Sequence, residues 1–94
     1  MKDETIFKYE LPRHGIRTIL IPKGGEVLGC KTQDNKINIW VLVNEKQNKI
    51  ERHFEVLFTG DDAYETANVK RVFIDTVLLL QDSLVCHVFE RVLK

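Results

Sequence analysis

The chain has 94 residues, of which 44% are hydrophobic and 30% are charged, as expected of one globular domain covering residues 1–94. Its 14 Lys and Arg residues balance 14 Asp and Glu residues. This zero net charge argues against a general nucleic-acid or membrane-surface binder. The sequence shows neither a secretory signal nor an apolar stretch long enough to span a bilayer, so we expect a cytoplasmic protein without membrane contact.

Alternation of apolar and polar residues dominates the chain and predicts seven short strands. Gly, Pro, Asp and Asn residues that favour turns separate them. The short connections leave no room for crossover helices, so we expect a single antiparallel all-β domain, either a sandwich or a small barrel. In chain order, the predicted strands cover residues 5–11, 16–21, 26–33, 37–43, 50–58, 71–80 and 84–92.

The fourth and fifth predicted strands carry the clearest patterns. Residues 37–43 are largely apolar on both faces toward their end, which indicates a central strand. Trp40 is expected in the core, although a large aromatic outside it would mark a partner interface. In residues 50–58, Arg52 is the only polar residue on the inward face. We expect its charged head to reach water near the start of the strand.

Helical structure is considered at two places. In residues 62–68, Asp62 and Glu65 have the spacing of a capping box, which favours a short helix. An irregular loop fits this segment equally well, so both alternatives stay open. Residues 72–80 could also form a helix, but their β-branched and aromatic content favours a strand.

Five motifs now stand in order along the predicted strands and turns. They read Phe7-Lys8-Tyr9-Glu10-Leu11-Pro12, Ile21-Pro22-Lys23-Gly24, Ile39-Trp40-Val41-Leu42-Val43, Phe58-Thr59-Gly60 and Val85-Cys86-His87-Val88-Phe89-Glu90. Their ordered set resembles a family of small proteins of similar length that tailed bacteriophages and prophages encode, with KYEL, MP-G, LWALV, GTG and HVFE-like motifs. The segment 61–80 departs from this pattern, and Phe58 stands where the family often has Gly. The resemblance implies a phage accessory protein acting in the infected bacterial cytoplasm, and it supplies no catalytic residues.

The residues that could support catalysis or metal binding form no recognisable constellation. The two cysteines and three histidines lack the close pairwise spacing of a zinc site. Cys86 and His87 are adjacent, so on a strand they point to opposite faces. Both Cys30 and Cys86 lie in apolar runs, where we expect reduced, buried thiols. The sequence therefore predicts no metal, no cofactor and no enzyme activity.

Basic residues give the most useful binding signal. Arg13, His14 and Arg17 cluster around one turn, and Lys70 with Arg71 begins the sixth predicted strand. Because the chain is neutral overall, such patches must be segregated from acidic residues such as those at 61–65. The five basic residues are therefore our predicted site for an anionic ligand or a partner protein.

These observations favour a non-enzymatic binding module. It would bind or inhibit a host protein, or sequester a small anionic signal, to act against host defence. One alternative is a phage structural or assembly protein that forms homo-oligomers through the edges of its first or last strand. A further alternative is a nucleic-acid binder with an exposed aromatic sheet face, which the neutral charge disfavours.

Overall fold

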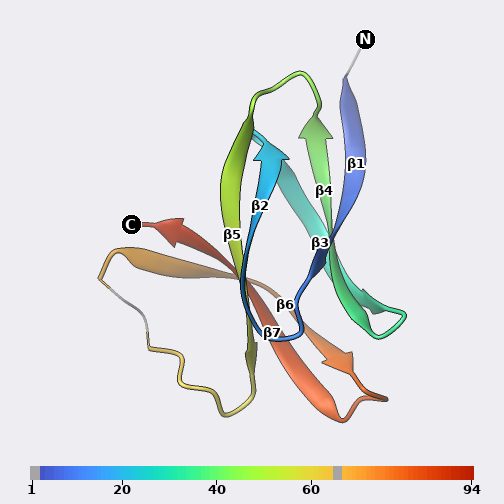
Figure 1. Cartoon of the computed structure of the whole chain (residues 1–94), viewed down its shortest axis with the longest axis vertical. Helices are drawn as coiled ribbons and strands as arrows, with labels where there is room; N and C mark the ends of the chain where they lie inside the picture. The colour runs from blue at the N-terminus through green and yellow to red at the C-terminus, as the bar shows by residue number, and fades with distance from the viewer. Residues whose placement is uncertain (1–2, 65–66) are drawn as a thin grey trace.

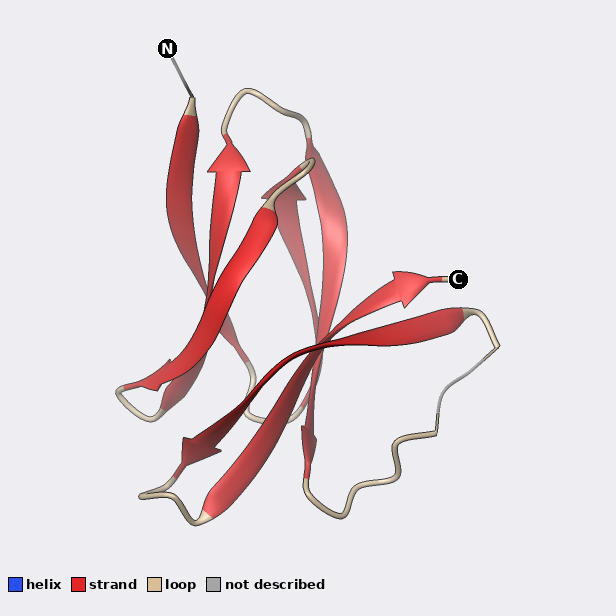
Figure 2. Cartoon of the chain, turned by 180° about the vertical axis from the view of Figure 1, so that it is seen from behind, coloured by secondary structure: helices blue, strands red, loops and turns tan. Residues whose placement is uncertain are grey.

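Across the residues that the structure describes, seven antiparallel strands form two sheets (Figure 1). The computed structural model describes residues 3–64 and 67–94. Figure 2 shows strands joined by loops, and neither described range contains a helix. The all-β prediction is confirmed, and the two sheets form a sandwich rather than a closed barrel. The strands are β1 (Glu4–Leu11), β2 (Gly15–Pro22), β3 (Glu26–Gln33), β4 (Lys36–Asn44), β5 (Lys49–Phe58), β6 (Val69–Leu79) and β7 (Leu84–Leu93).

The predicted strands agree with these bounds to within two residues. The helix considered over 72–80 is absent, because residues 72–79 belong to β6. In the segment 62–68, Asp62, Ala63 and Tyr64 are not helical, and neither are residues 67–68. The Asp62 carboxylate instead accepts the Tyr64 N–H at 3.0 Å, as in a turn. Glu65, the second residue of the predicted capping box, lies outside the described residues.

The two sheets combine hairpins with long-range pairs. The three-stranded sheet has the order β1-β4-β3, and the four-stranded sheet has the order β2-β5-β7-β6. The β3–β4 hairpin turns at Asp34 and Asn35, whose φ angles of 53° and 59° confirm the predicted left-handed turn pair. The first strand is a sheet edge, as predicted. The last strand is not, because β7 lies between β5 and β6.

The inward faces of both sheets pack into one core. Apolar residues alternate along each strand, so one row from each strand enters this core. Tyr9 and Phe7 pack against it. The buried side chains are Leu11, Cys30, Ile37, Ile39, Val41 and Val43 from the three-stranded sheet, and Ile19, Ile21, Phe54, Val56, Val77, Leu79, Cys86 and Val88 from the four-stranded sheet.

Trp40 lies outside this core, so the prediction that its side chain would be part of the core is wrong. It alternates with the buried Ile39 and Val41, which puts it on the outer face of the three-stranded sheet. There it stands opposite Lys8 of β1 and is half-buried. The position of Trp40 in the alternating strand determines on which face of the sheet its side chain lies, and the size of the side chain does not.

The four-stranded sheet splits at one end. Pairing between β5 and β7 runs only from His53↔Arg91 to Phe58↔Cys86. Beyond His53, β5 continues beside β2, whereas β7 continues beside β6. Both views show the C-terminal end of β7 swinging away from β5 (Figures 1 and 2). Ile50, which the alternation predicts to face inward, is consequently 41% exposed.

Candidate functional site

An apolar cleft occupies the split between β5 and β7, and we call it the β5–β7 cleft. It has a volume of about 640 Å³. Apolar side chains from four strands line it, and charged side chains lie toward its base. The lining residues are Ile16, Ile50, Glu51, Arg52, His53, Val69, Glu90, Arg91, Val92 and Leu93.

The hydrogen-bond alternation of β5 determines which backbone groups face this cleft. The Lys23 N–H donates to the Asn48 carbonyl at 2.8 Å, which continues the β2–β5 ladder by one pair. Hydrogen-bonded and non-hydrogen-bonded pairs alternate in an antiparallel ladder. The Arg52 backbone is therefore directed at β2, and the N–H and C=O of Glu51 are directed at the cleft.

The same reasoning applies to β7. The Lys94 N–H donates to the Asn68 carbonyl at 2.9 Å, one pair beyond Val69↔Leu93. The N–H and C=O of Leu93 consequently point away from β6 and into the cleft. In an unbroken ladder, Glu51 and Leu93 would form the next hydrogen-bonded pair. Within the described residues, no strand takes that place, so both walls of the cleft present backbone hydrogen-bonding groups.

An ion pair forms the base of the cleft. The Arg52 guanidinium donates two hydrogen bonds to the Glu90 carboxylate, at 2.7 and 2.8 Å, and a third to the Gly25 carbonyl. Both side chains are largely buried, so the predicted solvent-exposed head of Arg52 is wrong. The hydrogen bond to Glu90 raises the pKa of Arg52, against the opposing effect of burial. Gly25 is required here, because a Cβ would lie 2.9 Å from an Ile21 methyl group.

A second charged cluster lies beside the cleft on the outer face of the same sheet. The Glu55 carboxylate accepts hydrogen bonds from Arg71 at 2.7 Å and from Arg91 at 3.0 Å. Burial raises the pKa of Glu55, but the hydrogen bonds and charges of the two arginines outweigh it, and the net pKa is lowered. Glu55 is therefore an ionised, buried carboxylate on β5 that binds an arginine from β6 and another from β7.

Most of the basic residues predicted as a binding site are engaged within the protein. The His14 ring contacts the Asp61 carboxylate at 2.6 Å and stacks on Phe58 at 4.3 Å between ring centroids. The Phe58 N–H and His14 together lower the pKa of Asp61. The Arg17 guanidinium donates to the Glu10 carbonyl.

The other three of the five predicted basic residues are Arg71, Arg13 and Lys70. Arg71 also donates to the carbonyls of Ala63 and Tyr64, which ties these two residues of the β5–β6 loop to β6. Arg13 and Lys70 have exposed side chains.

The structure does not gather the five residues into one patch. Arg17 lies on β2 and Arg71 on β6, which are opposite edges of the four-stranded sheet. His14 and Arg71 also contact the loop that contains Asp61, so the basic residues are not segregated from this acidic segment. Their role in ligand binding stays a prediction.

Both cysteines are free and buried, as the sequence predicts. Burial, with a smaller contribution from nearby Asp75, raises the pKa of Cys30 to about 12. Burial also raises the pKa of Cys86. His87 is half-buried between the hydroxyls of Thr59 and Thr76, at 2.8 and 3.0 Å. Among residues 3–64 and 67–94, no three His, Cys, Asp or Glu side chains gather as a metal site.

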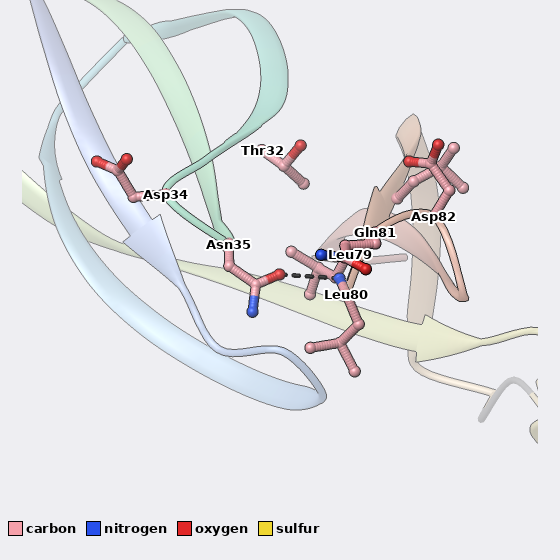
Figure 3. Close-up of a pocket in the computed structure, with 8 residues that line it drawn as sticks. Thr32, Asp34, Asn35, Leu79, Leu80, Gln81 and Asp82 are labelled. Carbon is pink, nitrogen blue, oxygen red and sulfur yellow. Dashed lines mark hydrogen bonds between the residues drawn. The ribbon is translucent and has the colours of Figure 1, made fainter.

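A second hollow lies where the β3–β4 and β6–β7 turns meet (Figure 3). The Asn35 side-chain oxygen accepts the Leu80 N–H at 2.8 Å and joins the two turns. Asp34 and Asp82 lie on opposite sides of this hydrogen bond in the view (Figure 3). Their carboxylates do not converge, so the hollow presents no chelating site.

The fold and the cleft define a small all-β sandwich domain with open strand edges. The chain belongs to the family described as Domain of unknown function (DUF7352), whose model matches residues 2–94. No curated protein and no solved structure matches the chain. No helix of the described ranges is long and apolar enough to cross a membrane.

Sequence reasoning missed the β5–β7 cleft, although one signal was available. Two oppositely charged residues, Arg52 and Glu90, occupy inward positions on strands whose other inward positions are apolar. Buried charges are generally paired, so this pattern could have predicted that the two residues meet. It could not have predicted that the strands separate beside them.

Proposed function

We propose that this protein is a non-enzymatic binding module that adds an extended segment of a partner protein to the open edge of β5. The observation that carries the proposal is the presence of outward backbone groups at Glu51 and Leu93 inside an apolar cleft. An extended peptide presents N–H and C=O groups at the spacing of a strand and satisfies such groups by β-augmentation. In the infected cell that the phage resemblance implies, the partner is a host protein that binding inhibits.

The lining of the cleft favours a peptide over a small anionic signal. Ile16, Ile50 and Val92 offer apolar contacts to alternate side chains of an added strand. The two arginines of the cleft wall are each paired with a carboxylate, Arg52 with Glu90 and Arg91 with Glu55. Glu51 and Glu90 also line the cleft and offset the charges of the two arginines, which leaves backbone pairing and apolar burial as the main sources of affinity.

The side chains of the cleft support binding better than catalysis. His53 shares a hydrogen bond of 2.7 Å with the Thr18 hydroxyl on the neighbouring strand. The thiols, which could act as nucleophiles, lie in the core with raised pKa values. A reactive thiol needs a lowered pKa and access to solvent. The groups nearest the ligand would therefore position it without reacting with it.

The proposal is tested by selecting a displayed library of random peptides against the folded protein. We expect enrichment of extended sequences with apolar residues at alternate positions. In amide NMR spectra, the selected peptides should shift the Glu51 and Leu93 signals and slow the exchange of both amides with solvent. A library that yields no enrichment over an unrelated β domain would refute the proposal.

Matched variants locate the site. Ile16→Asp combined with Leu93→Asp should weaken peptide binding by about tenfold or more, because both residues line the cleft and are 54% and 83% exposed. Leu78→Asp is the control, since Leu78 is 42% exposed at the far end of the same sheet. Binding that survives the cleft variants but is lost in Arg13→Glu/Arg17→Glu would move the site to the basic residues.

A further inference from the structure

β1 is an edge strand of the three-stranded sheet in the described part of the chain. β1 pairs with β4 on one side only, in a continuous register from Glu4↔Asn44 to Leu11↔Ile37. The Glu45 N–H donates to the Asp3 carbonyl at 3.4 Å, which sets the alternation of hydrogen bonds. By that alternation, the N–H and C=O groups that point away from β4 belong to Glu4, Ile6, Lys8 and Glu10.

One end of this edge is already in use. The Arg17 guanidinium donates to the outward carbonyl of Glu10, which agrees with the alternation. Pro12 follows β1 and has no N–H to offer. The edge available to another strand therefore consists of Glu4, Ile6 and Lys8.

We propose that two copies of the chain form a symmetric dimer through antiparallel pairing of β1 with β1, with Ile6 opposite Ile6 at the two-fold axis. In this register, Glu4 of each copy faces Lys8 of the other. Oppositely charged residues directly across a pair of strands attract each other. All three outward residues then pair, and the two three-stranded sheets become one continuous sheet.

Registers shifted toward the C-terminal end of β1 are less favourable for reasons visible in the sequence. Moving one strand so that Ile6 faces Lys8 would place Glu4 opposite Glu10 of the other copy. Moving it further would place Lys8 opposite Lys8. Like charges directly opposite each other destabilise a strand pair. A register that pairs Lys8 with Glu10 would need the carbonyl that Arg17 occupies and would oppose Ile6 to Pro12.

The outer face of the three-stranded sheet agrees with this pairing. Ile6 is 56% exposed and stands opposite the half-buried Leu42 of β4. In the dimer, the apolar row of one copy would continue directly into that of the other. Ile6, which is exposed in the single chain, would gain an apolar neighbour on its open side.

The electrostatic arm of the test uses charge reversal, with the dimer dissociation constant measured by sedimentation. Lys8→Glu should raise this constant by about tenfold or more, because the introduced carboxylate then lies directly opposite Glu4 of the second copy. The double variant Glu4→Lys/Lys8→Glu should restore dimerisation. Glu26→Lys is the control, since it reverses an exposed charge on β3 at the other edge of the same sheet, and it should leave the constant within about twofold. A wild-type protein that stays monomeric at all concentrations, or a double variant as weak as Lys8→Glu, would refute the proposal.

A crosslinking arm tests the register. Paired residues of a hydrogen-bonded site are about 5.5 Å apart between Cα atoms, within reach of a disulfide. Ile6→Cys should form a covalent dimer under mild oxidation, and Glu10→Cys on the same edge should not. Equal crosslinking of the two variants would exclude this register. The β5–β7 cleft lies in the other sheet, so either proposal can fail without the other.

Discussion

The two halves of β5 have the same alternating sequence pattern but different surroundings. His53–Phe58, the closed half, pairs with β7 throughout and with β2 as far as Val56, and its Phe54 is 1% exposed. Lys49–Arg52, the open half, lies beside β2 alone, and its Ile50 is 41% exposed. Alternation thus assigns a side chain to a face, but the strands alongside determine whether that face is buried.

Two glutamates on one face of β5 show the same contrast. Glu55 in the closed half is buried between Arg71 and Arg91. Glu51 in the open half is exposed at the cleft. The closed half therefore contributes to stability through its contacts, whereas the open half leaves its groups accessible to solvent.

Hydrogen exchange should show the largest difference between the halves. The Glu55 amide is directed at β7 within the ladder, so we expect exchange only on global unfolding, which costs about 5–15 kcal/mol in a domain of this kind. The Glu51 amide faces the cleft and should exchange with almost no protection. Arg52 is the internal control, because its amide is directed at β2 and should be protected. A Glu51 amide as slow as that of Arg52 would mean that the cleft is closed in solution.

Side-chain truncation should give the next largest difference. Phe54→Ala should lower the free energy of unfolding by about 3–5 kcal/mol, because it leaves a cavity in the core. Ile50→Ala removes a side chain from the open half and should cost about 1 kcal/mol or less. Urea denaturation measures both values. Similar losses for the two variants would contradict the division of β5 into halves.

The smallest expected effect is a pH dependence at Glu55. Its pKa is lower in the folded protein than the usual 4.5, so its ionisation stabilises the fold above that pH. This contribution is lost as the pH falls through the folded pKa. Glu55→Gln should therefore be less stable than the wild type at pH 7 by about 1–3 kcal/mol, and the gap should narrow below pH 4.5.

The control for this measurement is Glu51→Gln, which alters an exposed side chain on the same face. We expect it to change stability by at most about 0.5 kcal/mol. If the gap between wild type and Glu55→Gln stayed constant down to acid pH, the paired carboxylate would not be the source of the stability.

Local chemistry allowed much of the fold to be predicted. Alternation located all seven strands, because each strand exposes one face and buries the other. The turn at Asp34 and Asn35 was predictable because these residue types tolerate positive φ. Both features are determined by residues that are close together in the sequence, so they can be recognised in a single sequence.

The cleft could not be predicted in the same way. Its walls come from β5 and β7, whose contact at His53↔Arg91 joins residues far apart in the chain. Strand order and the point where two strands diverge depend on packing between whole sheets. The engagement of Arg17 and Arg71 by internal acceptors likewise arises only once the strands are in place.

The two buried thiols give the protein a built-in reporter of its own unfolding. Cys30 and Cys86 belong to different sheets and both lie in the shared core. Because native burial keeps them protonated and out of reach, an alkylating reagent would label them only in molecules whose sandwich has come apart. At reagent concentrations where labelling is faster than refolding, the rate of labelling would therefore follow the lifetime of the native state, without any introduced probe.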